Sequence, residues 1–157
     1  MSVLLRPMAA DEWMAWRDSA IEAYAADMVR VGAWPPDGAT ARAAAEFERF
    51  APNGRETPGH EFRSIVSEEG ATVGAVWFAP NDAIGDGSLF LWDIAIAPPF
   101  RGRGYGRAAL VALDQVALEL GYDSIRLHVF GDNQIARNLY RSTGYAETDV
   151  TMVKRLG

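Results

Sequence analysis

The sequence contains no cysteine among its 157 residues, and it has only two histidines, His60 and His128. Without cysteine the chain has no disulfide, no thiol nucleophile and no cysteine-bound metal. The two histidines lie far apart in the sequence and no ligand spacing surrounds them, so we expect no metal site. The lack of cysteine suits a protein of a reducing compartment.

Long apolar runs are also missing. No stretch approaches the roughly 18 uninterrupted apolar residues of a membrane-spanning helix, so we expect no membrane association. Residues 1–10 lack the basic cluster and apolar run of a signal peptide, and we therefore expect a cytoplasmic protein. The net charge of −6 argues against a general nucleic-acid surface and slightly favours cationic substrates.

The hydrophobic content of 49% and the length indicate one globular domain with one core. Hydrophobic periodicity separates helices from strands. It predicts helices at 9–31, 39–50, 107–120 and 133–142. It predicts strands at 3–6, 62–67, 72–78, 89–96 and 124–130, and one or two more within 145–155. This mixed order indicates an α/β protein with a central sheet and helices on both faces.

A glycine-rich loop follows the apolar run 89–96 and leads into a helix. Its sequence is Arg101-Gly102-Arg103-Gly104-Tyr105-Gly106-Arg107. Glycines let the backbone turn with its N–H groups pointing inward, and the helix adds free N–H groups and the positive end of its dipole. The loop therefore predicts an anion cradle suited to a pyrophosphate, with the arginines as countercharge. The alternative is an ordinary strand-to-helix connection with solvated arginines.

Two other phosphate-binding motifs do not fit this loop. A dinucleotide fold needs G-x-G-x-x-G after the first strand, whereas Gly102, Gly104 and Gly106 are evenly spaced and come late in the chain. A P-loop needs G-K-[ST], and the loop contains no lysine.

Two blocks together carry a resemblance to a known family. The first, Arg101-x-x-Gly104-x-Gly106 after the strand 89–96, resembles the acetyl-CoA signature of the GNAT superfamily of N-acetyltransferases. The second block is similar to the late helix of that family. It reads Asn133-x-x-Ala136-x-x-Leu139-Tyr140-x-x-x-Gly144-Tyr145. The segment between the blocks has room for the helix and the strand that the family places there.

The resemblance implies the GNAT fold, in which a mostly antiparallel sheet splays apart between its fourth and fifth strands. It implies a single domain over 1–157, with 1–60 shaping the acceptor site and 89–145 binding acetyl-CoA. Acetyl-CoA is then the co-substrate, and no metal is needed. The resemblance also allows a homodimer.

The resemblance assigns roles to residues as well. Backbone groups of the fourth strand would contact the pantetheine arm and the thioester carbonyl, and the glycine loop would hold the pyrophosphate. The implied cofactor-binding residues are Ile94, Ala95, Ile96, Arg101, Gly102, Arg103, Gly104, Tyr105, Gly106, Arg107, Asn133, Ala136 and Tyr140. Tyr140 would also be catalytic, as the general acid that protonates the leaving thiolate; its alternative is an aromatic packed in the core.

Direct attack by an amine also needs a hydrogen-bond donor to the oxyanion that develops on the thioester oxygen, and the backbone N–H of Ile96 suits that role. It further needs a base that removes a proton from the amine. Asp93 is the one carboxylate inside the apolar strand, and burying an unpartnered charge is costly, so we expect it to be the catalytic base. Pairing with an arginine or capping a loop is the alternative for Asp93. His128, His60, Glu61 and a water-mediated route stay open as sources of deprotonation.

The resulting hypothesis is an N-acetyltransferase acting on a small primary amine. An acetyltransferase of a protein N-terminus or side chain is the first alternative, and a non-catalytic domain that senses acyl-CoA is the second. We expect Trp13 and Trp16 to lie in the core, whereas Trp34 fits the core and an acceptor pocket equally well.

Overall fold

The computed structural model describes residues Met1–Gly157 as two compact units, Met1–Leu127 and His128–Gly157. The first unit contains all strands and three of the α-helices, and the second contains one α-helix and the C-terminal segment. None of the helices is long and apolar enough to cross a membrane.

The first unit is built on one five-stranded sheet in the order β1-β2-β3-β4-β5. The strands are β1 (Val3–Pro7), β2 (Glu61–Ser67), β3 (Thr72–Pro80), β4 (Leu89–Ile96) and β5 (Ile125–Leu127). β1 to β4 pair antiparallel, and β5 pairs parallel to β4. The mixed, mostly antiparallel sheet that we expected is confirmed.

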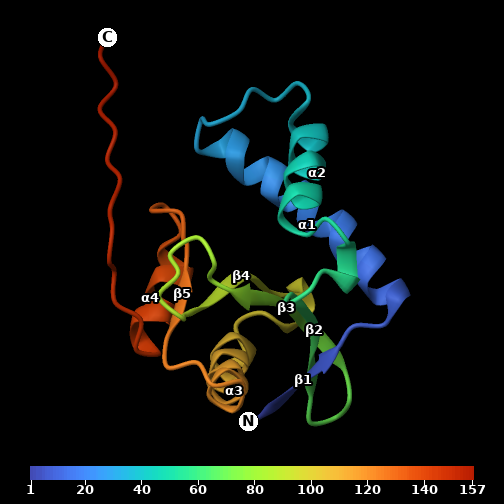
Figure 1. Ribbon diagram of the computed structural model, residues 1–157. Coiled ribbons are helices and arrows are strands. Elements are labelled where there is room, and N and C mark those ends of the chain that lie inside the picture. The colour runs from blue at the N-terminus through green and yellow to red at the C-terminus, as the bar shows by residue number, and fades with distance from the viewer. The chain divides into compact units, whose positions relative to one another are not determined.

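Helices cover both faces of this sheet (Figure 1). α1 (Ala10–Arg30) and α2 (Ala39–Phe50) lie together on one face, and α3 (Tyr105–Glu119) packs on the other face against β1 and β4. Short 3-10 turns follow α2 at Gly54–Glu56 and β4 at Pro98–Phe100. In the second unit, α4 spans Gln134–Ser142.

The core between the sheet and the first two helices is aromatic. Trp13 and Trp16 from α1 pack against buried Phe62 and Trp77 from β2 and β3, as expected for core tryptophans. A separate cluster joins α1 to α2 and contains Trp34, which is only 9% exposed. Trp34 therefore belongs to the core, which decides between its two interpretations.

The prediction of one or two strands within 145–155 is wrong, because residues 145–157 form neither helix nor strand. The fifth strand is also shorter than expected, at Ile125–Leu127. A β-strand exists only where a neighbouring strand satisfies its backbone groups, and side-chain alternation does not reveal whether that neighbour is present.

Candidate active site

A β-bulge in β4 sets the direction of its side chains. Trp77 of β3 pairs with Asp93 and the next residue, Phe78, pairs with Leu91, so Trp92 is an extra residue on β4. Successive side chains normally point to opposite faces of a sheet, and a bulge cancels one alternation. Trp92 and Asp93 therefore both face α1 and α2.

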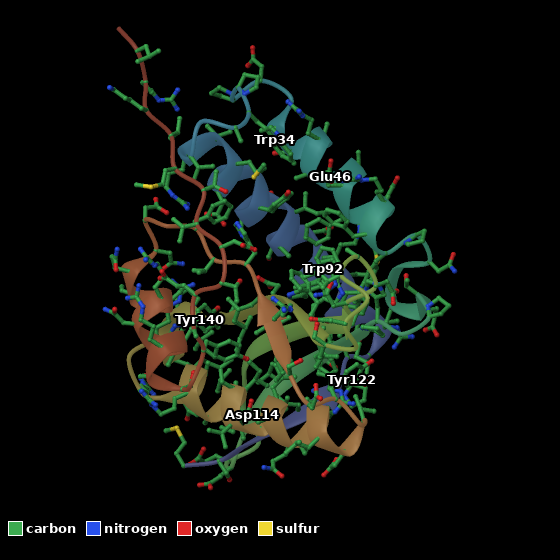
Figure 2. The ribbon with its side chains drawn as sticks, turned by 60° about the vertical axis from the view of Figure 1, so that its left-hand side comes forward. Trp34, Glu46, Trp92, Asp114, Tyr122 and Tyr140 are labelled. Atoms are coloured by element: carbon green, nitrogen blue, oxygen red, sulfur yellow. The ribbon has the colours of Figure 1, made fainter.

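The contacts of these two residues confirm that placement. Trp92 stacks on Trp77 with ring centroids 5.0 Å apart, and it contacts Phe50 of α2 at 4.7 Å. Figure 2 shows Trp92 among the side chains between the sheet and the first two helices. Asp93 accepts a hydrogen bond from the side chain of Trp16 on α1. The bulge that a sequence pattern leaves undetermined thus directs the carboxylate toward α1.

The Asp93 carboxyl retains some surface, but protein atoms surround it closely. This burial raises its pKa to about 6. The Trp16 hydrogen bond opposes the shift and the negative charge of Asp27 adds to it. A carboxylate with a pKa near 6 is mostly ionised at neutral pH and still basic enough to accept a proton, which suits a general base.

The second half of β4 has an open edge. β4 and β5 pair only from Leu89 to Leu91, whereas pairing with β3 continues to Ile96. The N–H of Ala97 donates to Val73 on the β3 side. Because N–H groups alternate along a strand, that of Ile96 points to the opposite edge, where β5 has ended. The splay that we expected between the fourth and fifth strands is confirmed.

The glycine loop turns through two left-handed residues, Gly102 with φ of 72° and Gly104 with φ of 90°. A Cβ atom on Gly102 would meet nothing within 4 Å, so the space beside it is open. Gly104 is the N-cap of α3, and no side chain caps the helix or places an acidic group in its first turn. The first hydrogen bond of the helix runs from the N–H of Ala108 to the carbonyl oxygen of Gly104. The N–H groups of Tyr105 and Gly106 precede that bond, so no carbonyl of an earlier helical turn accepts from them.

The arginines of the loop are placed differently from one another. Arg101 donates from Nε to the carbonyl oxygen of Ile96 at 2.8 Å, which fixes its guanidinium at the end of β4. The guanidinium of Arg103 lies over the ring of Phe100 at 5.9 Å. Arg107 is exposed on the first turn of α3. The loop therefore combines free donors, a helix N-terminus and positive charge, which is the donor set that suits a pyrophosphate.

Asn133, Ala136 and Tyr140 belong to the second unit. Asn133 is the N-cap of α4, and its side-chain oxygen accepts from the N–H of Ala136 at 3.2 Å. The ring of Tyr140 meets that of Tyr145 edge to face at 5.6 Å, and Tyr140 is half-buried. Figure 2 shows its place on α4.

The other candidate bases have structural partners. His60 accepts at Nδ1 from the indole N–H of Trp77 at 3.0 Å, and burial lowers its pKa while Asp82 opposes that change. Glu61 forms an ion pair with Arg63. His128 is exposed and contacts Phe130 edge to face. Among these candidate bases, Asp93 is the carboxylate whose surroundings raise its pKa, to about 6.

Sequence reasoning did not identify Trp16 as the partner of Asp93. The two residues are far apart in the chain, and no spacing rule links a helix residue to a strand residue at that separation. The structure gathers no group of three or more His, Cys, Asp or Glu side chains that could hold a metal ion.

Comparison with known proteins agrees with this geometry. A family model described as acetyltransferase (GNAT) family matches residues 13–145. The uncharacterized N-acetyltransferase YycN of Bacillus subtilis is 37% identical over 99% of this chain and 100% of its own length. The uncharacterized N-acetyltransferase YdgE of the same organism is 31% identical over 99% of both chains.

Solved structures show the same relationship. The crystal structure of YycN superposes with a TM-score of 0.93 over 99% of both chains. The structure of AAC(6')-Iy in complex with a CoA bisubstrate analogue, 16% identical, shares the fold with a TM-score of 0.62 over 100% of this chain and 99% of that one. The chain therefore belongs to the acetyltransferase (GNAT) family, and it is an acyl-CoA-dependent N-acetyltransferase.

Proposed function

We propose that the chain transfers the acetyl group of acetyl-CoA to the primary amine of a small molecule by direct attack, with Asp93 as the base. The observation that carries this proposal is the Asp93 carboxylate with a pKa of about 6 on the strand whose far end has an open edge. A protonated amine must lose a proton before it attacks, since its own pKa is about 10.

The residues that would hold acetyl-CoA are those of β4 and the glycine loop. The N–H groups of Gly102, Tyr105 and Gly106, with the charge of Arg103 and Arg107, would bind the pyrophosphate. The N–H of Ile94, like that of Ile96, points to the open edge and would bind the pantetheine arm. Bound acetyl-CoA supplies the thioester carbonyl, which is the electrophile of the reaction.

Each step of the chemistry then has a residue. Asp93 accepts the proton of the ammonium group, directly or through a water molecule. The N–H of Ile96 donates to the thioester oxygen as negative charge develops on it. Tyr140 gives its proton to the departing sulfur and regains one from the attacking nitrogen, directly or through water, so that both protons lost by the ammonium group have an acceptor. This role of Tyr140 rests on the resemblance of the late helix. Asn133, with its oxygen occupied as the α4 cap, has its amide N–H groups left to bind the cofactor arm.

Two features support an acceptor that carries a positive charge. The net charge of −6 attracts a positively charged amine. The negative charge of Asp27 also acts on Asp93, so a second carboxylate lies within electrostatic reach of the base. We place the enzyme in the cytoplasm, in keeping with the absence of cysteine.

The test is thiol release from acetyl-CoA with a panel of small amines and a panel of peptides. We expect turnover with at least one small amine, and a loss of about 10²-fold or more in the Asp93→Asn variant at pH 7. Asp114→Asn, on α3, is a matched control with unchanged turnover. Turnover with peptides alone would reject the small-molecule acceptor, and full activity in Asp93→Asn would reject the base.

A further inference from the structure

A small pocket lies at the C-terminal end of α2. It has a volume of about 200 Å³ and is enclosed by α1, α2, β2 and the turn that follows α2. The rings of Trp13, Phe47 and Phe62 form its apolar walls, and Arg17 and Glu48 are the two charged residues that line it. A small-molecule site usually has this form, with apolar walls and a few polar groups that orient the ligand.

This pocket is separate from the surroundings of Asp93. Phe62 of β2 pairs with Trp77 of β3, and Trp77 in turn pairs with Asp93 of β4. Two strand spacings, or roughly 10 Å, therefore separate the backbone of Phe62 from that of Asp93. The indole of Trp77 stacks on the ring of Phe62, with ring centroids 5.3 Å apart. The pocket thus borders the aromatic core at β2, and the reaction proposed above does not use it.

The guanidinium of Arg17 forms no hydrogen bond, although its side chain is only 25% exposed. Its ion pair is with Asp18, the next residue of the chain, at 3.6 Å, and that distance is too long for a hydrogen bond. A guanidinium has five N–H donors, and covering them without acceptors costs free energy. Arg17 therefore offers the pocket a set of donors that suits a carboxylate, and the chain itself supplies none there.

Glu48 of α2 places the opposite charge at the rim of the pocket. It is exposed, and it forms no ion pair with Arg17 or with any other basic residue. Glu46, one turn-face away on the same helix, is already paired with Arg49. Glu48 is therefore available to an ammonium group that enters the pocket beside Arg17.

The combination of walls, charges and size narrows the class of ligand. An amine without a carboxylate would be repelled by Arg17, and a carboxylate without an ammonium group would be repelled by Glu48. A purely apolar molecule would cover the guanidinium of Arg17 without giving it an acceptor. The volume of about 200 Å³ is below the roughly 300–1,000 Å³ of sites for drug-sized molecules, so the ligand is small. A small zwitterion with an apolar body meets all of these conditions.

We propose that this pocket binds a free α-amino acid with a large apolar side chain, at a site separate from that of acetyl transfer. The carboxylate of the amino acid pairs with the guanidinium of Arg17, and its ammonium group pairs with Glu48. The apolar side chain lies against the rings of Trp13, Phe47 and Phe62. Leucine and phenylalanine have the required combination of two charges and an apolar body.

Isothermal titration of the full chain with leucine and phenylalanine tests the ligand class. We expect saturable binding of both amino acids. Leucinamide lacks the carboxylate and should bind about 10-fold more weakly than leucine, or worse, because it cannot pair with Arg17. Isocaproate lacks the ammonium group and should bind roughly 2–5-fold more weakly, because the lost pair with Glu48 is exposed to solvent. No binding of either amino acid at millimolar concentration, or an analogue that binds as tightly as leucine, overturns the proposal.

Two variants locate the binding site. Arg17→Met should weaken leucine binding by about 10-fold or more, and Glu48→Gln should weaken it by roughly 2–5-fold, for the same reasons as the two analogues. Glu22→Gln is the matched control, since Glu22 is exposed on α1 and does not line the pocket; it should bind leucine as the parent does. An unchanged leucine affinity in either Arg17→Met or Glu48→Gln overturns this pocket as the site.

Asp93→Asn separates the pocket from the acceptor site. Asp93 does not line the pocket, so this variant should bind leucine with the parent's affinity whether or not it still transfers acetyl groups. The result for leucine is therefore independent of whether Asp93 is the base. A loss of leucine binding in Asp93→Asn would place the amino acid in the acceptor site and overturn the separate pocket.

Discussion

The indole of Trp16 donates a hydrogen bond to the carboxyl of Asp93, and so α1 controls the charge of a residue on β4. The bond stabilises the ionised carboxylate, whereas burial stabilises the protonated form, and burial is the larger effect. The pKa of about 6 is the balance between the two.

Trp16→Phe should therefore raise the pKa of Asp93 further, because only the opposing hydrogen bond is lost. If Asp93 is the base, the acidic limb of the kcat/KM profile moves to higher pH by about half a unit to one unit. The profile of kcat/KM against pH measures the shift. Trp13→Phe is the matched control, since the Trp13 indole nitrogen is buried without a partner, and its profile should stay where it is in the parent. Coincident profiles for all three proteins would contradict the coupling.

Gly104→Val should weaken acetyl-CoA binding by about 10-fold or more. The residue has φ of 90°, and a β-branched side chain both strains that conformation and fills the space next to the first N–H groups of α3. Isothermal titration with coenzyme A gives the affinity.

Gly121→Val is a control for the strain alone, because Gly121 also has φ of 90° and follows the opposite end of α3. We expect both variants to lose similar stability and only Gly104→Val to lose affinity. Equal affinities in the two folded variants would remove the loop from the cofactor site.

Gly74→Ala should destabilise the sheet where β3 pairs with the C-terminal half of β4. A Cβ atom there would lie 2.2 Å from the carbonyl oxygen of Ala95, which is backbone and has no freedom to rotate away. We expect a loss of about 2–4 kcal/mol in unfolding free energy, measured by denaturant titration. Gly131→Ala, with no atom within 4 Å of the new Cβ and no positive φ, should change stability by about 0.5 kcal/mol at most.

How far sequence alone predicted the structure depends on the kind of interaction. The bounds of β4 and α2 follow from local patterns, and the structure reproduces them, because long apolar runs and end signals such as the Pro98–Pro99 pair are local. The direction of Asp93 was not predictable, since the bulge at Trp92 depends on pairing with Trp77 in another strand. The prediction of strands within 145–155 was wrong for the same reason. The β-propensity of those residues is a local property, whereas a strand forms only where a neighbouring strand pairs with it.

Glu12 provides a pH-dependent contribution to stability. Its carboxylate binds Arg6 through two bonds of 2.9 Å, the N–H of Ala9 at 3.1 Å and the hydroxyl of Ser64 at 3.0 Å. The Arg6 bond is the largest cause of a pKa lowered from 4.5 to about 2. Since the folded pKa lies below the unfolded one, the stabilisation is complete above pH 4.5 and is lost as pH falls toward 2.

Glu12→Gln should therefore cost about 1–2 kcal/mol at pH 7 and progressively less below pH 4.5, as measured by denaturant titration across that range. Solvent screens the ion pair with Arg6 and keeps this loss small, because both side chains are partly exposed. Glu22→Gln, at an exposed position of the same helix, should change stability little at either pH. A constant difference between Glu12→Gln and the parent from pH 7 to pH 3 would contradict the linkage.

Tyr140→Phe tests the assignment of the general acid. Loss of the hydroxyl should lower kcat by roughly 10–100-fold, while the affinity for coenzyme A stays within a few-fold, because a proton donor acts in the transition state and not in ground-state binding. Thiol release at saturating substrate gives kcat. Tyr145→Phe is the matched control, since the two rings meet edge to face in the same unit and the substitution keeps that contact. A purely structural role for Tyr140 predicts similar small effects in both variants, whereas the acid role predicts that only Tyr140→Phe loses turnover. The acid role also predicts a smaller loss with amines that attack slowly, because attack and not departure of the sulfur then limits the rate.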